Sequence, residues 1–79
     1  MDYLITFEST AQAIRAEDIF LKNNVKVKIR PLPNEISSGC GISIAFADLV
    51  IVKKLVADNQ IIYNRIYLKQ NNEYREKSD

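Results

Sequence analysis

The sequence predicts an α+β protein with a ferredoxin-like βαββαβ sandwich, in which a four-stranded antiparallel sheet carries two helices on one face. Short runs with apolar residues at alternate positions are typical of strands, two stretches with apolar residues at three- and four-residue steps indicate helices, and the order of these segments is βαββαβ. Right-handed crossovers place both helices on the same side of one sheet. With 79 residues the chain has room for a single domain, which we expect to span residues 1–69.

The chain begins with a predicted strand and helix. Residues 3–7 are aromatic and β-branched, which favours a strand. Ser9 precedes Gln12 by three residues, the spacing of a capping box, so a helix should begin there and end at Asn23-Asn24. The apolar face of this helix comprises Ala13, Ala16, Ile19 and Phe20.

A strand, a long loop and another strand should follow. Residues 25–30 alternate apolar and cationic side chains, which predicts a strand with one face in solvent. Pro31 and Pro33 lack a backbone N–H, so we expect the strand to break there and a loop to run through Gly41. Residues 42–46 alternate again and predict a third strand, with Ile42, Ile44 and Phe46 on one face.

The last third of the chain predicts a helix, a strand and a tail. Asp48 suits the cap of a helix that ends near Asp58-Asn59. The packing stripe of this helix is Leu49, Val52, Leu55 and Val56. Residues 60–69 return to strand composition. One face of that strand would carry Tyr63, Arg65, Tyr67 and Lys69, and the other Ile62, Ile66 and Leu68. The polar residues 70–79 are expected to fray.

Charge and composition exclude several classes of function. Lys and Arg total 11 against 10 Asp and Glu, so the net charge of +1 provides no field that recruits nucleic acid or an anionic membrane. No apolar run approaches the ~18 residues that cross a bilayer, and the N-terminus lacks the pattern of a signal peptide, so we expect a cytoplasmic protein. The absence of histidine excludes Cys–His catalysis and the usual zinc sites. We expect no metal and no tightly bound cofactor.

Cys40, the only cysteine, stands between the only two glycines, in the stretch ISSGCGI. Two interpretations are open. If the following strand extended back, Cys40 would share the parity of Ile42 and pack in the core as a small apolar residue. Flanking glycines instead favour a turn in which the backbone has positive φ or approaches a ligand closely, with an exposed, reactive thiol. The groups that could support a thiolate in such a turn are Ser37, Ser38, Gly39, Gly41, Lys28 and Arg30.

The segments ITFESTAQAIRAE, PLPNEISSGCGISIAF and RIYLKQ together resemble a family of small bacterial proteins described as selenium/sulfur carrier-like. The stretch ISSGCGI is similar to the family's serines followed by Cys-Gly and an apolar strand. The resemblance therefore implies that Cys40 is the carrier position. Ser9 and Thr10 match a Ser-Thr pair after the first strand, and Glu17 matches an acidic position in the first helix.

The resemblance also implies a function. Cys40 would accept sulfur or selenium as a persulfide-type adduct and pass it to a partner protein, with a cysteine desulfurase or a similar enzyme as the donor. In that family a basic residue often stands where this chain has Ala45, and Lys28 or Arg30 is the candidate to replace it. The protein would thus be a carrier or a binding protein rather than a stand-alone enzyme.

Two other functions stay open. A non-catalytic interaction module would pair with a second copy or with another protein through the sheet face or a sheet edge, with Tyr63 and Tyr67 as anchors. RNA binding would use the face of a ferredoxin-like sheet, but this chain has Cys40 and Ile42 where RNA-recognition domains carry stacking aromatics. The sequence therefore favours a protein contact over nucleic acid.

Overall fold

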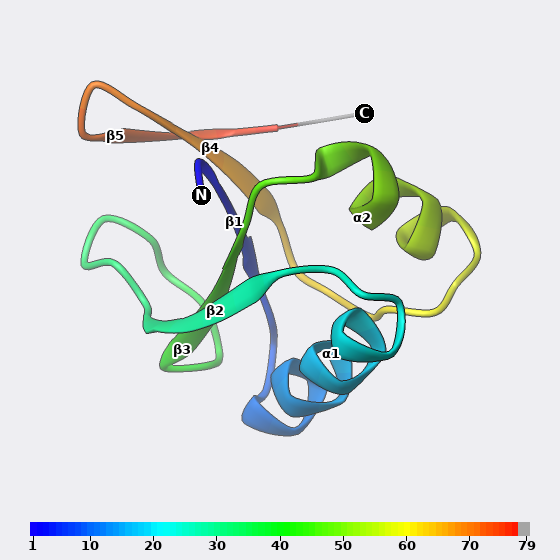
Figure 1. Ribbon diagram of the computed structural model, residues 1–79. Helices are drawn as coiled ribbons and strands as arrows, with labels where there is room; N and C mark the ends of the chain where they lie inside the picture. The colour runs from blue at the N-terminus through cyan, green and yellow to red at the C-terminus, as the bar shows by residue number, and fades with distance from the viewer. Residues whose placement is uncertain (78–79) are drawn as a thin grey trace.

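The computed structural model describes residues 1–77, which form a five-stranded antiparallel sheet and two helices (Figure 1). Along the chain the elements are β1 (Tyr3–Thr6), α1 (Thr10–Lys22), β2 (Val27–Pro31), β3 (Ile42–Phe46), α2 (Leu49–Ala57), β4 (Ile66–Gln70) and β5 (Glu73–Glu76). The strand order is β2-β3-β1-β4-β5. The predicted α+β class is confirmed, but the predicted number of four strands is wrong; the ferredoxin-like assignment stays a prediction.

Both helices begin at the predicted capping residues. The Gln12 N–H donates to Ser9 Oγ at 3.2 Å, while Gln12 Oε1 accepts from the Glu8 N–H, one residue earlier than a capping box requires. The Ile51 N–H donates to Asp48 Oδ1 at 3.2 Å. These bonds satisfy first-turn donors that have no partner within the helix. Neither helix of the described residues is long and apolar enough to cross a membrane.

Among residues 1–77, asparagine rather than glycine occupies the left-handed backbone positions. Asn24 and Asn59, each with a φ of 58°, follow the C-caps of α1 and α2. In each helix the N–H of this asparagine and that of the next residue donate to carbonyls of the last turn at 2.9 to 3.1 Å, which is the Schellman pattern. Neither glycine has a positive φ, so of the two alternatives for the glycines around Cys40 the positive φ is wrong.

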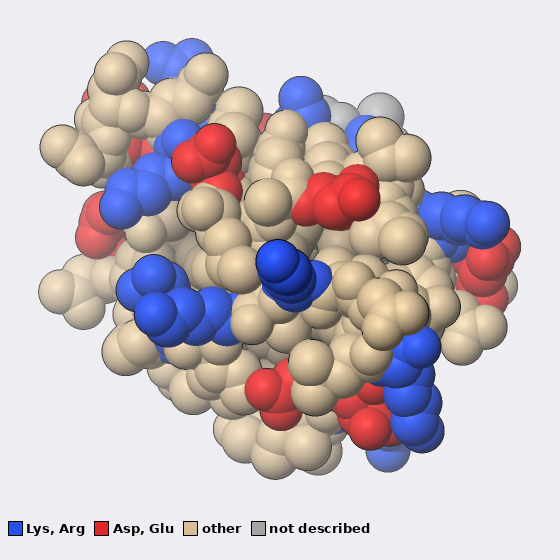
Figure 2. Space-filling model, in the orientation of Figure 1, with Lys and Arg blue, Asp and Glu red and all other residues tan. Residues whose placement is uncertain are grey.

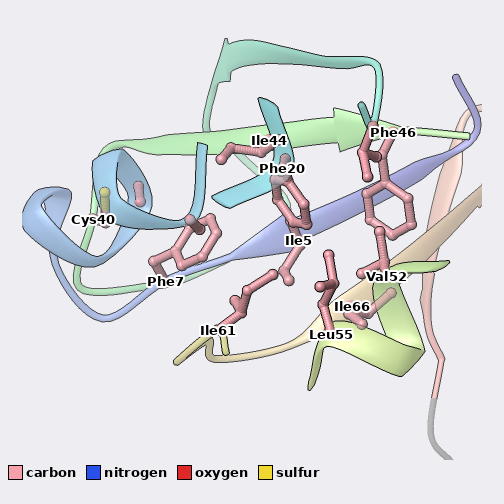
Figure 3. Close-up of a cluster of buried hydrophobic side chains, with 13 residues drawn as sticks. Ile5, Phe7, Phe20, Cys40, Ile44, Phe46, Val52, Leu55, Ile61 and Ile66 are labelled. Atoms are coloured by element: carbon pink, nitrogen blue, oxygen red, sulfur yellow. The ribbon is translucent and has the colours of Figure 1, made fainter. Parts of the chain in front are cut away.

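The main hydrophobic core lies between the two helices and one face of the sheet (Figure 3). The sheet contributes residues at alternate positions of β1 and β3, because side chains of the same parity share a face. The ring of Tyr3 also stacks on that of Phe46, with centroids 5.4 Å apart. The predicted packing faces of both helices are confirmed. The core includes Ile5, Phe7, Ala13, Ala16, Phe20, Ile44, Phe46, Val52, Leu55, Ile61 and Ile66.

The face of the sheet without helices carries a second, smaller cluster. Leu4 and Ala45 turn to this face because they alternate with residues of the main core. Ile36, from the loop of residues 32–41, is buried in the same cluster. At the margin of the cluster lie Leu32, Tyr67 and Tyr74. The loop therefore folds back over the sheet and covers part of a face that the sequence predicts to be in solvent.

Pro31 does not break the pairing of β2 as predicted. It lies opposite Ile42 and is the last residue of the strand. The Leu32 N–H donates to Gly41 O at 3.0 Å, and in an antiparallel pair the direction of the backbone groups alternates along the strand. Pro31 therefore directs the position of its missing N–H toward the free edge, where a proline is tolerated.

The C-terminal part differs most from the prediction. Residues 60–65 form a connection rather than a strand, and β4 begins at Ile66. Residues 67–70 pair with residues 73–76, and the turn between them has positive φ at both Asn71 and Asn72, as a type I′ hairpin requires. The predicted fraying is therefore wrong for residues 70–76, whose β5 extends the sheet beyond the predicted end of the domain. Residues 78 and 79, which the same prediction included, lie outside the described residues.

Candidate functional site

Cys40 lies at one end of the main core and not on the surface. Its side chain belongs to the same cluster as Phe7 and Ile44, and the residue is only 3% exposed (Figure 3). The interpretation of an exposed thiol in a glycine-flanked turn is therefore wrong for this conformation. The alternative, a small apolar residue on the core side of the chain, describes where the side chain lies.

The loop that carries Cys40 is fastened to the connection between β1 and α1. Ser38 Oγ donates to Phe7 O and accepts from the Cys40 N–H, the latter at 3.2 Å. Gly39 lies so close to the backbone of Glu8 that a Cβ added at Gly39 would overlap Glu8 O. A Cβ added at Gly41 would meet nothing within 4 Å. Gly39 is thus required by a close backbone approach, and Gly41 is not.

Thr10 contacts the sulfur of Cys40. Its Oγ1 lies 3.6 Å from Cys40 Sγ, a distance at which either atom can donate a hydrogen bond. Thr10 is itself exposed and is the first residue of α1. The sulfur therefore contacts an exposed side chain at the N-terminus of a helix.

The other residues predicted to support a thiolate are only partly brought together. Ser37 is exposed. Lys28 pairs with Ala45 and Arg30 with Ser43, so both cations project from the sheet face opposite the one that packs with Cys40. The predicted electrostatic support from these two residues is therefore not assembled. Position 45, where the resemblance places a basic residue, also turns away from the thiol.

Tyr63 and Tyr67 do not form the predicted common surface. Tyr63 packs against the main core and Tyr67 against the second cluster, on the other side of the sheet. The reason is that residues 60–65 are not a strand, so the alternation read from the sequence does not continue through them. The aromatic platform that RNA binding would use is not assembled from these two residues.

Thr10 is the site residue that reasoning from pattern and spacing missed. It stands 30 residues from Cys40 in the chain, and only the folding of the loop onto the start of α1 brings the two side chains together. The single signal in the sequence was the Ser-Thr pair that the family resemblance picked out. The position of Thr10 in the first turn of a predicted helix gave no reason to connect it with the thiol of Cys40.

A comparison with protein families covers most of the chain. The family model described as "Putative Se/S carrier protein-like" matches residues 2–68. The matched part runs from the residue before β1 into β4 and contains both Thr10 and Cys40, whereas β5 lies beyond it. Searches of the curated proteins and of the solved structures give no match.

Proposed function

The chain belongs to the Se/S carrier protein-like family, and from this premise we propose that Cys40 is the residue that carries sulfur or selenium. The observation that supports this assignment most directly is the place of the sulfur. It is the only thiol of the chain, and it contacts the exposed Thr10 at the start of α1.

The proposed loading step is a thiol exchange that needs no separate oxidant. The Cys40 thiolate attacks the terminal sulfur of a persulfide on the donor, such as a cysteine desulfurase. A new S–S bond forms at Cys40, the S–S bond of the donor breaks, and the donor cysteine leaves as a thiolate. In delivery, a nucleophile of the acceptor attacks the terminal sulfur of the Cys40 persulfide, and Cys40 leaves as a thiolate. For selenium, the terminal atom is selenium.

Loading requires that the sulfur first be uncovered. The cover consists of the exposed Thr10 side chain and of a loop held by the two hydrogen bonds of Ser38. Local openings of this size occur with much smaller free energies than global unfolding. A persulfide adds one sulfur atom to a side chain that is already packed in the core, and a packed core does not accommodate an added atom without rearrangement. We therefore expect loading to shift the loop from the closed toward an open conformation.

The test is the intact mass of the protein after incubation with a cysteine desulfurase and cysteine. The native chain should gain one sulfur, which a reducing agent removes. Cys40→Ser and Cys40→Ala are matched controls, because the first keeps a small polar group beside Thr10 and the second does not; neither should gain mass. Circular dichroism checks that all three chains are folded.

A failure of the native chain to gain sulfur would contradict the proposal. If the folded native chain gains no sulfur under conditions in which the desulfurase loads a known thiol acceptor, Cys40 is not a carrier of sulfur. Labelling of Cys40 in the unfolded chain confirms in the same experiment that the thiol is chemically intact.

A further inference from the structure

One edge of the sheet offers unpaired backbone groups. β2 pairs with β3 on one side and has no neighbour among the described residues on the other. Because the Leu32 N–H donates to Gly41 O, the alternation of an antiparallel pair turns the backbone groups of Lys28 and Arg30 toward β3. The N–H and C=O groups of Val27 and Ile29 therefore point to the free edge, ready to bond to a further strand.

Three exposed apolar side chains, interspersed on α1 with Glu17 and Asp18, lie on the helix side of this edge. Ile29 of β2 is 39% exposed, and Ile14 and Leu21 of α1 are 57% and 59% exposed. Ile14 and Leu21 lie seven residues apart and so share one side of the helix. The opposite side of α1, with Gln12 and Ile19, lines a hollow with residues 59–62. The side with Ile14 and Leu21 therefore faces away from the α2–β4 connection and toward the β2 edge, on which α1 also packs.

A basic border lies on the other side of the edge. Lys28 and Arg30 are exposed and project from the face without helices, and Lys26 precedes them. None of the three forms an ion pair with any residue that the structure describes. In the space-filling view, basic side chains lie on the surface over β2 (Figure 2). A strand added at this edge would therefore meet apolar side chains on one face and cations on the other.

We propose that the free edge of β2 binds an extended acidic segment of a partner protein, in which apolar residues alternate with Asp or Glu. The backbone groups of Val27 and Ile29 would supply the hydrogen bonds. The exposed apolar side chains on the helix side would contact the apolar residues of the segment, and the cations on the other side would attract its Asp or Glu residues. Cations on an edge also serve to prevent pairing, but that role does not account for apolar side chains exposed along the same edge. Pro31 lies opposite Ile42, so the bound segment would end beside the Cys40 loop.

A second copy of the chain does not fit this edge. Two β2 strands side by side would place Lys28 and Arg30 of one copy against the same cations of the other, and like charges on adjacent strands repel. The proposal does not depend on sulfur transfer, because no contact in it involves the thiol. The Cys40→Ala variant should bind the same segment with unchanged affinity.

The probe is a capped seven-residue peptide in which valine alternates with glutamate, titrated into the full chain and followed by backbone NMR. Shifts should concentrate on residues 26–31 and on the exposed side of α1. A valine–lysine peptide of the same length should bind at least about tenfold more weakly, because two cross-strand pairs change from attraction to repulsion. A Lys28→Glu, Arg30→Glu variant should reverse this preference, and both replacements are at exposed positions.

N-methylated peptides test the hydrogen bonds without any change to the protein. A strand in a sheet turns only alternate N–H groups toward one neighbour, so methylation of the valine amides and of the glutamate amides should differ. One set should abolish binding and the other should retain it. Equal binding by both methylated peptides, equal binding of the lysine peptide, or a dimer of the free chain that buries the β2 edge would each overturn the proposal.

Discussion

The two faces of the sheet are covered by different means. On one face, α1 and α2 pack on β1 and β3 and enclose a continuous set of large apolar side chains. On the other face, the loop of residues 32–41 reaches back and covers the sheet mainly through Ile36. Helices hold their packing residues through their own backbone hydrogen bonds, whereas a loop depends on a few side-chain anchors. The same loop carries Cys40 into the helix-covered face.

The largest expected effects are the losses of stability when one buried side chain is truncated on each face of the sheet. Phe46→Ala removes a fully buried ring from the main core and should lower the free energy of unfolding by about 3 to 5 kcal/mol. Ile36→Ala should cost about 2 kcal/mol, since the loop above it can collapse into the space. Urea denaturation measures both values.

The labelling of Cys40 by a thiol reagent in the absence of urea sharpens this comparison. Ile36→Ala should accelerate labelling more than its loss of stability alone explains, because Ile36 anchors the loop. Equal losses of stability in the two variants, with no extra labelling in Ile36→Ala, would mean that both faces are held with the same strength.

The next largest effect is a difference in stability between alanine substitutions at the two glycines beside the thiol. Gly39→Ala forces a Cβ against Glu8 O, so the loop or the β1–α1 connection must shift, at about 1 to 3 kcal/mol of stability. Gly41→Ala, with open space around the added Cβ and no positive φ, should change stability by less than about 1 kcal/mol, in the stabilising direction. Thermal unfolding of the two variants is the measurement. A loss at position 41 equal to that at 39 would contradict the account of the close approach.

The smallest effect on stability concerns Thr10. Thr10→Ala and Thr10→Val both remove the hydroxyl at an exposed position and should alter the free energy of unfolding by only about 0.5 kcal/mol. Only the alanine variant also removes the atoms that cover Cys40 Sγ. Thiol labelling of the folded chain should therefore be faster in Thr10→Ala and close to the native rate in Thr10→Val. Identical rates in the two variants would show that access is controlled elsewhere.

Local patterns predicted the elements whose determinants lie within a few residues of one another. Ser9 and Asp48 were identified as helix starts because each side chain bonds to a backbone N–H three residues later. The packing stripes of both helices follow from a periodicity of three and four residues. The β4–β5 hairpin was missed because its turn uses Asn71-Asn72 instead of glycine, and its strand is polar enough to resemble a tail.

The amino-acid order by itself determined the two helices, the alternation of the central strands and the presence of a single thiol between two glycines, because each of these depends on neighbours in the chain. Only the tertiary structure decided that the thiol is buried, that Thr10 contacts it, and that Lys28 and Arg30 lie on the other side of the sheet. Burial depends on where a loop folds back after the strands have paired. The docking of this loop rests on contacts between Ser38 and Phe7 and between Cys40 and Thr10, residues about thirty positions apart, for which the sequence holds no periodic signal.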